Sequence, residues 1–134
     1  MSWTAYVSDQ LYTPGQMCSA GIYGLDGGEW AQQGVLKPLP QDITRLISII
    51  QGREKDFNGI RVGGMSFLYI NHDPQEGCIT LNRINAPSDE EKYVCCGYLS
   101  KGCFIFGAVV GNYRMGNCSK VACRLRDYLK QVGY

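Results

Sequence analysis

Large aromatic side chains at the two ends of the chain have the types and spacing of a peptide-binding surface. Trp3 and Tyr6 are three residues apart near the start of the sequence, and Tyr128 precedes Tyr134 by six near its end. Terminal segments of small domains are usually polar and frayed unless something holds them. If these segments form helices that pack side by side, they gather four rings into one exposed groove. Grooves of this type bind extended proline-rich peptides, so the pattern favours a binding protein over an enzyme.

Two amphipathic helices are expected to carry these rings. Apolar residues recur at helical spacing over residues 2–11, with Ser2 as N-cap and a proline-glycine turn at 13–15 as the end. A last helix is expected from about Asn117, capped by Asn117 or Ser119. The positions that it is expected to bury are Val121, Leu125, Leu129 and Val132.

The middle of the chain predicts one more helix and a run of strands. A helix follows Pro40, where apolar residues recur at i, i+3, i+4 and i+7 from Ile43, and Gly52 ends it. Strands are expected at 18–23, 29–32, 60–62, 65–71, 78–83, 92–99 and 103–110. Because their connections are short, neighbouring strands should be antiparallel. The sequence therefore predicts a single α+β domain over residues 1–134, with helices on an antiparallel sheet.

Composition and charge exclude several classes of protein. The chain has 134 residues, of which 45% are apolar and 19% charged, and its net charge of +1 argues against a general nucleic-acid binder. With no signal peptide or membrane span in the sequence, we expect a cytoplasmic protein. Residues 114–134 hold five basic residues against one acidic residue. This basic segment suits an acidic partner or phosphorylated lipid head groups, and a solvated helix face is an equal alternative.

Catalytic and metal-binding chemistry is not indicated. The one histidine, His72, is expected in a turn, and the sequence has no nucleophile elbow, phosphate-binding loop or zinc-protease motif. Cysteines stand at positions 18, 78, 95, 96, 103, 118 and 123, an odd set without a Cys-x-x-Cys pair. We expect free, buried thiols and neither a metal nor a cofactor. Cys95 and Cys96 are adjacent in a strand, so their side chains should point to opposite faces.

Several segments resemble the profilin family, in the family's order and over the full length of the chain. They are residues 1–6, 26–31, 58–64, 115–120 and 125–134. The resemblance implies a central antiparallel sheet, with the N- and C-terminal helices packed together on one face and smaller helices on the other. It also implies a regulator of actin polymerisation at the cytoskeleton, which binds monomeric actin, proline-rich partners such as filament nucleators and elongators, and phosphoinositide membranes.

The resemblance also implies which residues make each site. Polyproline-binding positions correspond to Trp3, Tyr6, Trp30, Tyr128, Leu129 and Tyr134. Actin-binding positions correspond to Arg83, Arg114, Gly116, Ser119, Lys120 and Arg124. Phosphoinositide binding is assigned to Lys120, Arg124 and Arg126 in the basic segment.

Departures from the family pattern leave two alternatives open. Ser66 and Asn71 stand where many members have basic residues, and Arg124 stands where animal members often have an acidic one. A reversed charge against a like-charged partner can cost several kcal/mol. One alternative is therefore a polyproline-binding adaptor with weak or lost actin binding. A more distant alternative is a small-ligand sensor on a similar architecture, which would require an apolar internal cavity.

Overall fold

An antiparallel sheet organises the molecule in the computed structural model, which describes residues 2–55, 59–111 and 115–134. Over these residues the sheet has seven strands in the order β2-β1-β7-β6-β5-β4-β3. The strands are β1 (Ser19–Gly24), β2 (Glu29–Gly34), β3 (Ile60–Val62), β4 (Met65–Asp73), β5 (Cys78–Arg83), β6 (Tyr93–Leu99) and β7 (Cys103–Val110). Each of the six strand pairs is antiparallel. The pairing of β1 with β7 joins the two ends of the chain into one sheet.

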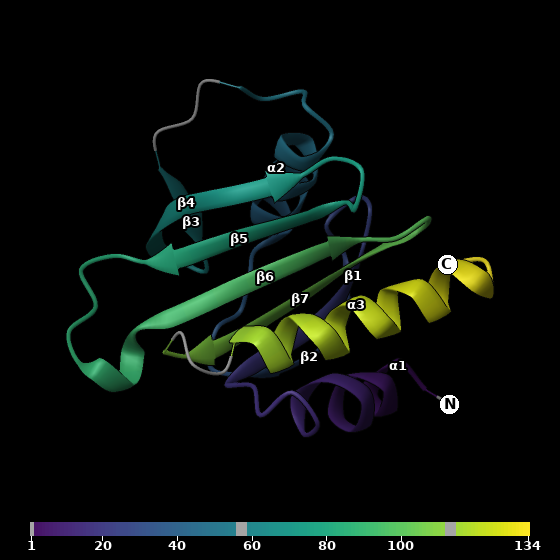
Figure 1. Ribbon diagram of the computed structural model, residues 1–134, viewed down its shortest axis with the longest axis horizontal. Helices are drawn as coiled ribbons and strands as arrows, with labels where there is room; N and C mark the ends of the chain where they lie inside the picture. Colours follow the sequence, from purple (N-terminus) through teal and green to yellow (C-terminus); the bar gives the residue numbers. More distant parts are fainter. Residues whose placement is uncertain (1, 56–58, 112–114) are drawn as a thin grey trace.

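Helices cover both faces of this sheet. They are α1 (Trp3–Ala5), which continues into the π-helix η1 (Tyr6–Tyr12), α2 (Pro40–Ile50), the short 3₁₀ helix η2 (Asp89–Glu91) and α3 (Met115–Gln131). Figure 1 shows α3 crossing one face of the sheet beside α1 and η1, with α2 on the opposite face. Both termini lie at the same end of the molecule (Figure 1). The expected α+β fold, with the terminal helices together on one face, is confirmed.

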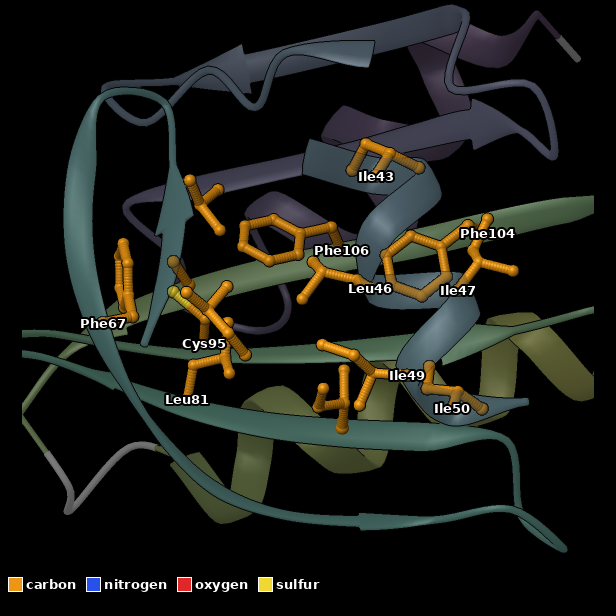
Figure 2. Close-up of a cluster of buried hydrophobic side chains, with 14 of the residues drawn as sticks. Ile43, Leu46, Ile47, Ile49, Ile50, Phe67, Leu81, Cys95, Phe104 and Phe106 are labelled. Atoms are coloured by element: carbon orange, nitrogen blue, oxygen red, sulfur yellow. The ribbon is translucent and has the colours of Figure 1, made fainter. Parts of the chain in front are cut away.

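The core beneath α2 comes from the helical stripe that the sequence predicted. Ile43, Leu46 and Ile47 are at most 3% exposed, and they pack on the sheet against Phe104 and Phe106 (Figure 2). The start of α2 is fixed by Asp42, whose Oδ2 accepts the Leu39 N–H at 2.8 Å and the Gly63 N–H at 2.9 Å. This carboxylate caps the helix and ties it to the turn between β3 and β4.

A second core lies between the sheet and the terminal helices. Val7 and Leu11 from η1 and Leu125 and Leu129 from α3 are at most 4% exposed and pack against the strands there. Full burial of a side chain of this size contributes roughly 1.5–3 kcal/mol to the stability of the fold. These four side chains therefore anchor both helices firmly. This core is the platform that holds the terminal aromatic residues in place.

The adjacent cysteines of β6 divide between the two cores. Cys95 belongs to the core beneath α2 and Cys96 to the core beneath α3, as strand alternation requires. Cys96 Sγ lies 3.4 Å from Cys118 Sγ of α3. All seven cysteines are free, and Cys18, Cys78 and Cys123 are partly exposed where full burial was expected.

Three local predictions differ from the structure. The first helix changes to π-helical hydrogen bonding after Ala5, although Ser2 caps it as expected, its Oγ accepting from the Ala5 N–H at 3.2 Å. The last helix begins by Met115, and Asn117 caps nothing, because its Nδ2 donates to the Pro14 carbonyl at 2.8 Å. His72 lies in β4 and not in a turn, since pairing with β5 continues to Asp73.

Candidate aromatic binding site

Five aromatic side chains from three segments form one surface cluster. This aromatic cluster consists of Trp3, Tyr6, Trp30, Tyr128 and Tyr134. Trp3 is at its centre: its ring centroid is 4.7 Å from Trp30, 5.0 Å from Tyr134 and 5.6 Å from Tyr6. Tyr134 meets Trp3 edge to face, at 89° between the ring planes. Such pairs contribute about 0.5–1.5 kcal/mol each beyond the burial of area, so the rings hold one another in a defined arrangement.

The hairpin between β1 and β2 delivers Trp30 to the cluster. Across its turn, the Gly24 N–H donates to the Gly28 carbonyl at 2.8 Å, and Asp26 Oδ1 accepts the Gly28 N–H at 2.9 Å. Gly27 has φ of +89° and its missing Cβ would overlap the Pro40 backbone, so only glycine fits there. The turn thereby sets where β2 begins and brings Trp30 beside the N-terminal helix.

The end of α3 is folded back to present Tyr134. The Tyr134 N–H donates to the Leu129 carbonyl at 2.7 Å, and Gly133 adopts φ of +99°, which ends the helix in a left-handed turn. The Tyr134 carbonyl in turn accepts the N–H of Gly102, in the connection between β6 and β7. This hydrogen bond was not predicted, because the sequence of a tight turn does not indicate which distant residue it will contact.

The two apolar residues near Tyr134 have different roles. Leu129 is 1% exposed and belongs mainly to the core, whereas Val132 is 49% exposed. The prediction that α3 buries Val132 is wrong, because the helix ends at Gln131 and Val132 lies in the turn that follows. Val132 instead lines a small cavity of about 280 Å³ together with Trp3, Tyr6, Leu129 and Tyr134.

The chemistry of the aromatic cluster suits a ligand with flat apolar rings and unpaired carbonyls. Tyr128 and Tyr134 are 45% and 46% exposed, and they add hydroxyl groups to a largely apolar surface. A hydrogen bond with Tyr128 raises the pKa of Tyr6, so the Tyr6 hydroxyl stays protonated at neutral pH. A polyproline II helix matches these properties, since its backbone carbonyls are free and its pyrrolidines stack on aromatic rings.

Residues expected at the actin face are distributed over two elements. Gly116 and Lys120 are exposed on the first half of α3, where Ser119 is half-buried, and Arg124 is exposed one turn further. Arg114 lies outside the described residues. Gly116, Ser119 and Lys120 therefore lie away from the end of α3 that carries Tyr128, whereas Arg124 lies one turn before Tyr128 and next to it.

Arg83 occupies a less open position than expected. Its Nη1 donates to the Glu91 carbonyl at 3.2 Å and lies 3.7 Å from a carboxylate oxygen of the same residue. Its guanidinium also lies 5.4 Å from the centroid of the Tyr93 ring, and its side chain is 13% exposed. Arg83 therefore braces the end of β5, with only its edge reaching the surface.

Arg126 is separated from the other two cations assigned to phosphoinositides. Lys120 and Arg124 are exposed, but Arg126 is 3% exposed and points into the connections between strands. It donates to the carbonyl and carboxylate of Glu76, to the Leu99 carbonyl and to Asp127. Burial opposes its charge, but the hydrogen bond and the charge of Asp127 outweigh burial and raise its pKa. Arg126 ties α3 to the sheet and is not accessible to a lipid head group.

Within residues 2–55, 59–111 and 115–134, no group of three or more His, Cys, Asp or Glu side chains is placed to hold a metal ion. In the same part of the chain, no helix has the length and apolar character needed to cross a membrane.

Comparison with known proteins gives one consistent result. The family model described as Profilin matches residues 1–134. A profilin of Trypanosoma brucei brucei is 31% identical over 101 residues, which are 64% of this chain and 67% of that protein. Profilin-P of Physarum polycephalum is 26% identical over 135 residues and the whole of both chains.

Solved structures share the fold at lower identity. Acanthamoeba castellanii profilin IA has a TM-score of 0.81 at 22% identity, covering 99% of this chain and 100% of that one. Mouse profilin IIa, in complex with a double repeat from the FH1 domain of mDia1, has a TM-score of 0.80 at 18% identity over all of both chains. LokiProfilin1 in complex with rabbit actin has a TM-score of 0.67 at 13% identity, covering 93% and 92%.

Proposed function

Because the chain belongs to the profilin family, whose members are binding proteins and not enzymes, we propose that it regulates actin polymerisation. In this proposal the aromatic cluster binds proline-rich partners, and a separate face that includes the first half of α3 binds monomeric actin. A proline-rich tract on a filament nucleator or elongator then raises the effective concentration of bound actin near a growing filament end. The protein would act in the cytoplasm.

The aromatic cluster is the observation that carries the proposal. Five rings, from α1, η1, β2, α3 and the turn that follows α3, meet at centroid distances of 4.7–6.3 Å and stay partly exposed. A contiguous apolar surface that stays exposed is typical of an interaction site, and the rings are rigid, so little ordering entropy opposes binding of a stiff ligand. The related mouse profilin IIa, solved with an FH1 repeat, supports the same use of this fold.

Removing Trp3 tests polyproline binding directly. Trp3 contacts three other rings of the cluster, so Trp3→Ala should raise the Kd for a proline-only peptide at least about tenfold. This rise corresponds to a loss of about 1.4 kcal/mol of binding free energy. Calorimetry is the suitable readout, because the substitution changes the intrinsic fluorescence. Val35→Ala, at a residue 65% exposed on another surface, is the control. An unchanged Kd in the Trp3 variant rejects the assignment of the groove.

A charge reversal on α3 tests actin binding. Lys120 is exposed on the first half of α3, so Lys120→Glu should weaken binding of labelled monomeric actin and leave the proline-only peptide unaffected. Lys130→Glu, the same change on the same helix beyond that face, is the matched control. LokiProfilin1, solved with actin, supports the use of this fold for actin. If the wild-type protein binds the peptide but not actin, it is a polyproline adaptor, and Ser66, Asn71 and Arg124 become the residues to revert.

Phosphoinositide binding is the weaker part of the proposal and now rests on Lys120 and Arg124. Each basic residue near an anionic membrane contributes about 1 kcal/mol, so two accessible cations favour reversible attachment only. Vesicles with and without phosphoinositides, compared in a sedimentation assay at low and at physiological salt, measure this attachment. Loss of binding in Lys120→Glu supports it, and equal binding to neutral vesicles rejects it.

A further inference from the structure

The groove between the two terminal helices continues beyond the aromatic cluster. The N-terminal segment and α3 run antiparallel: Trp3 meets Tyr134, Tyr6 meets Tyr128, and Pro14 accepts a hydrogen bond from Asn117. The small cavity beside Trp3 occupies one end of this groove. A larger cavity, of about 430 Å³, occupies the stretch between the Tyr6–Tyr128 pair and Pro14. It is lined by Tyr6, Gln10, Pro14, Val121, Arg124, Leu125 and Tyr128.

The lining of this larger cavity has a defined chemistry. Its floor is Val121 and Leu125, which are 9% and 4% exposed, and the rings of Tyr6 and Tyr128 form the wall that it shares with the aromatic cluster. Arg124 is exposed at the rim and supplies the one charge among the lining residues. The volume falls within the roughly 300–1,000 Å³ of small-ligand sites. A ligand with an apolar group beside a carboxylate fits this cavity, because the apolar group can pack on Val121 and Leu125 while the carboxylate pairs with Arg124.

Spacing along the groove relates the two cavities to a single peptide. Leu129 lines the small cavity and Val121 lines the large one, and the two residues are about 12 Å apart along α3. A polyproline II helix rises about 3.1 Å per residue, so about four residues span that distance. A residue that flanks a proline stretch can therefore reach the large cavity while the prolines remain on Trp3.

We propose that the large cavity is a specificity subsite for the residues that flank a proline stretch. It takes a large apolar side chain, leucine or phenylalanine, and Arg124 pairs with an acidic residue next to it. The inference rests on the proposed polyproline binding, and it adds a preference that the aromatic cluster alone does not give. Burial of the apolar side chain supplies affinity, and the rim charge selects among sequences.

Four peptides with a common core of about eight prolines, roughly 25 Å of polyproline II helix, test the subsite. The core is flanked by Gly-Gly, Leu-Glu, Ala-Glu or Leu-Lys, and each is made with the flank at either end because the direction of binding is open. The Leu-Glu peptide should bind about tenfold more tightly than the Gly-Gly peptide in one of the two directions, with smaller gains for Ala-Glu and Leu-Lys.

Arg124→Glu should reverse the charge preference, so that Leu-Lys binds more tightly than Leu-Glu. Lys130→Glu, the same change on an exposed residue that does not line the cavity, should keep the wild-type order. If the Gly-Gly peptide binds and no flank improves its Kd, the subsite is rejected and the proposed function stands. If none of the peptides binds, the proposed function and the subsite fail together.

Discussion

Replacing Arg126 should destabilise the protein far more than replacing any other cation of α3. The Arg126 side chain is 4% exposed and lies 5.4 Å from the centroid of the Tyr98 ring. Its donors reach the carbonyl of Glu76, in the turn between β4 and β5, and the carbonyl of Leu99, at the end of β6. Asp127 accepts from Arg126 Nε at 2.7 Å. One guanidinium thus holds α3 against the β4–β5 turn and the end of β6.

The magnitude follows from which of these contacts are buried. The carboxylates of Glu76 and Asp127 are 65% and 64% exposed, so their ionic contributions are small, about 0–1 kcal/mol each. Hydrogen bonds from a charged donor to the carbonyls of Glu76 and Leu99, both of them partly buried, contribute more, about 1.5–3 kcal/mol each. Arg126→Ala should therefore lower the free energy of unfolding by about 3–5 kcal/mol. For a chain of this size that corresponds to a fall in Tm of about 11–18 °C.

Thermal unfolding followed by circular dichroism measures this effect. Arg126→Met retains much of the packing against Tyr98 without the donors, so the difference between the Met and Ala variants separates packing from hydrogen bonding. Arg124→Ala is the matched control, and its Tm should stay within about 2 °C of wild type because surface substitutions cost little. If Arg126→Ala lowers Tm no more than Arg124→Ala does, the hydrogen bonds of Arg126 do not hold α3 against the sheet.

Two further predictions concern the sheet and the buried thiols. Gly97→Ala should lower the free energy of unfolding in urea by about 2–3 kcal/mol, because the added Cβ would overlap the buried Phe104 ring. The added Cβ of Gly116→Ala meets nothing within 4 Å, so this control should be neutral or slightly stabilising. Equal effects of the two substitutions would contradict the close packing of Gly97 against Phe104. Burial raises the pKa of both Cys18 and Cys103 to about 11 from 9.0. Unfolded thiols therefore lose protons first, so their contribution to stability is complete below pH 9 and declines as pH rises to 11. Urea midpoints across that range measure the decline, which should be shallower in the double serine variant.

The order and type of most elements were predictable from sequence, for reasons that act locally. The stripe that starts at Ile43 forms a helix because one helical face packs on the sheet, and the glycine-rich segment at 24–28 turns because it supplies residues that tolerate positive φ. Trp3 and Tyr6 were recognised by type and spacing. The π-helical stretch from Tyr6 to Tyr12 had no local signal, since its hydrogen bonds depend on how η1 packs against α3 and the sheet.

Arg124 and Arg126 show where local information ends. Two residues apart on a helix, they point roughly 200° apart, so only one of them can face the sheet. The sequence by itself determined that α3 is amphipathic and that aromatic residues stand at both ends of the chain. Tertiary structure decided that Arg126 is buried, that Val132 is exposed and that Trp30 joins Trp3 and Tyr134. The reason is that each of these outcomes depends on segments distant in sequence, which meet only when β1 pairs with β7 and brings the terminal helices together.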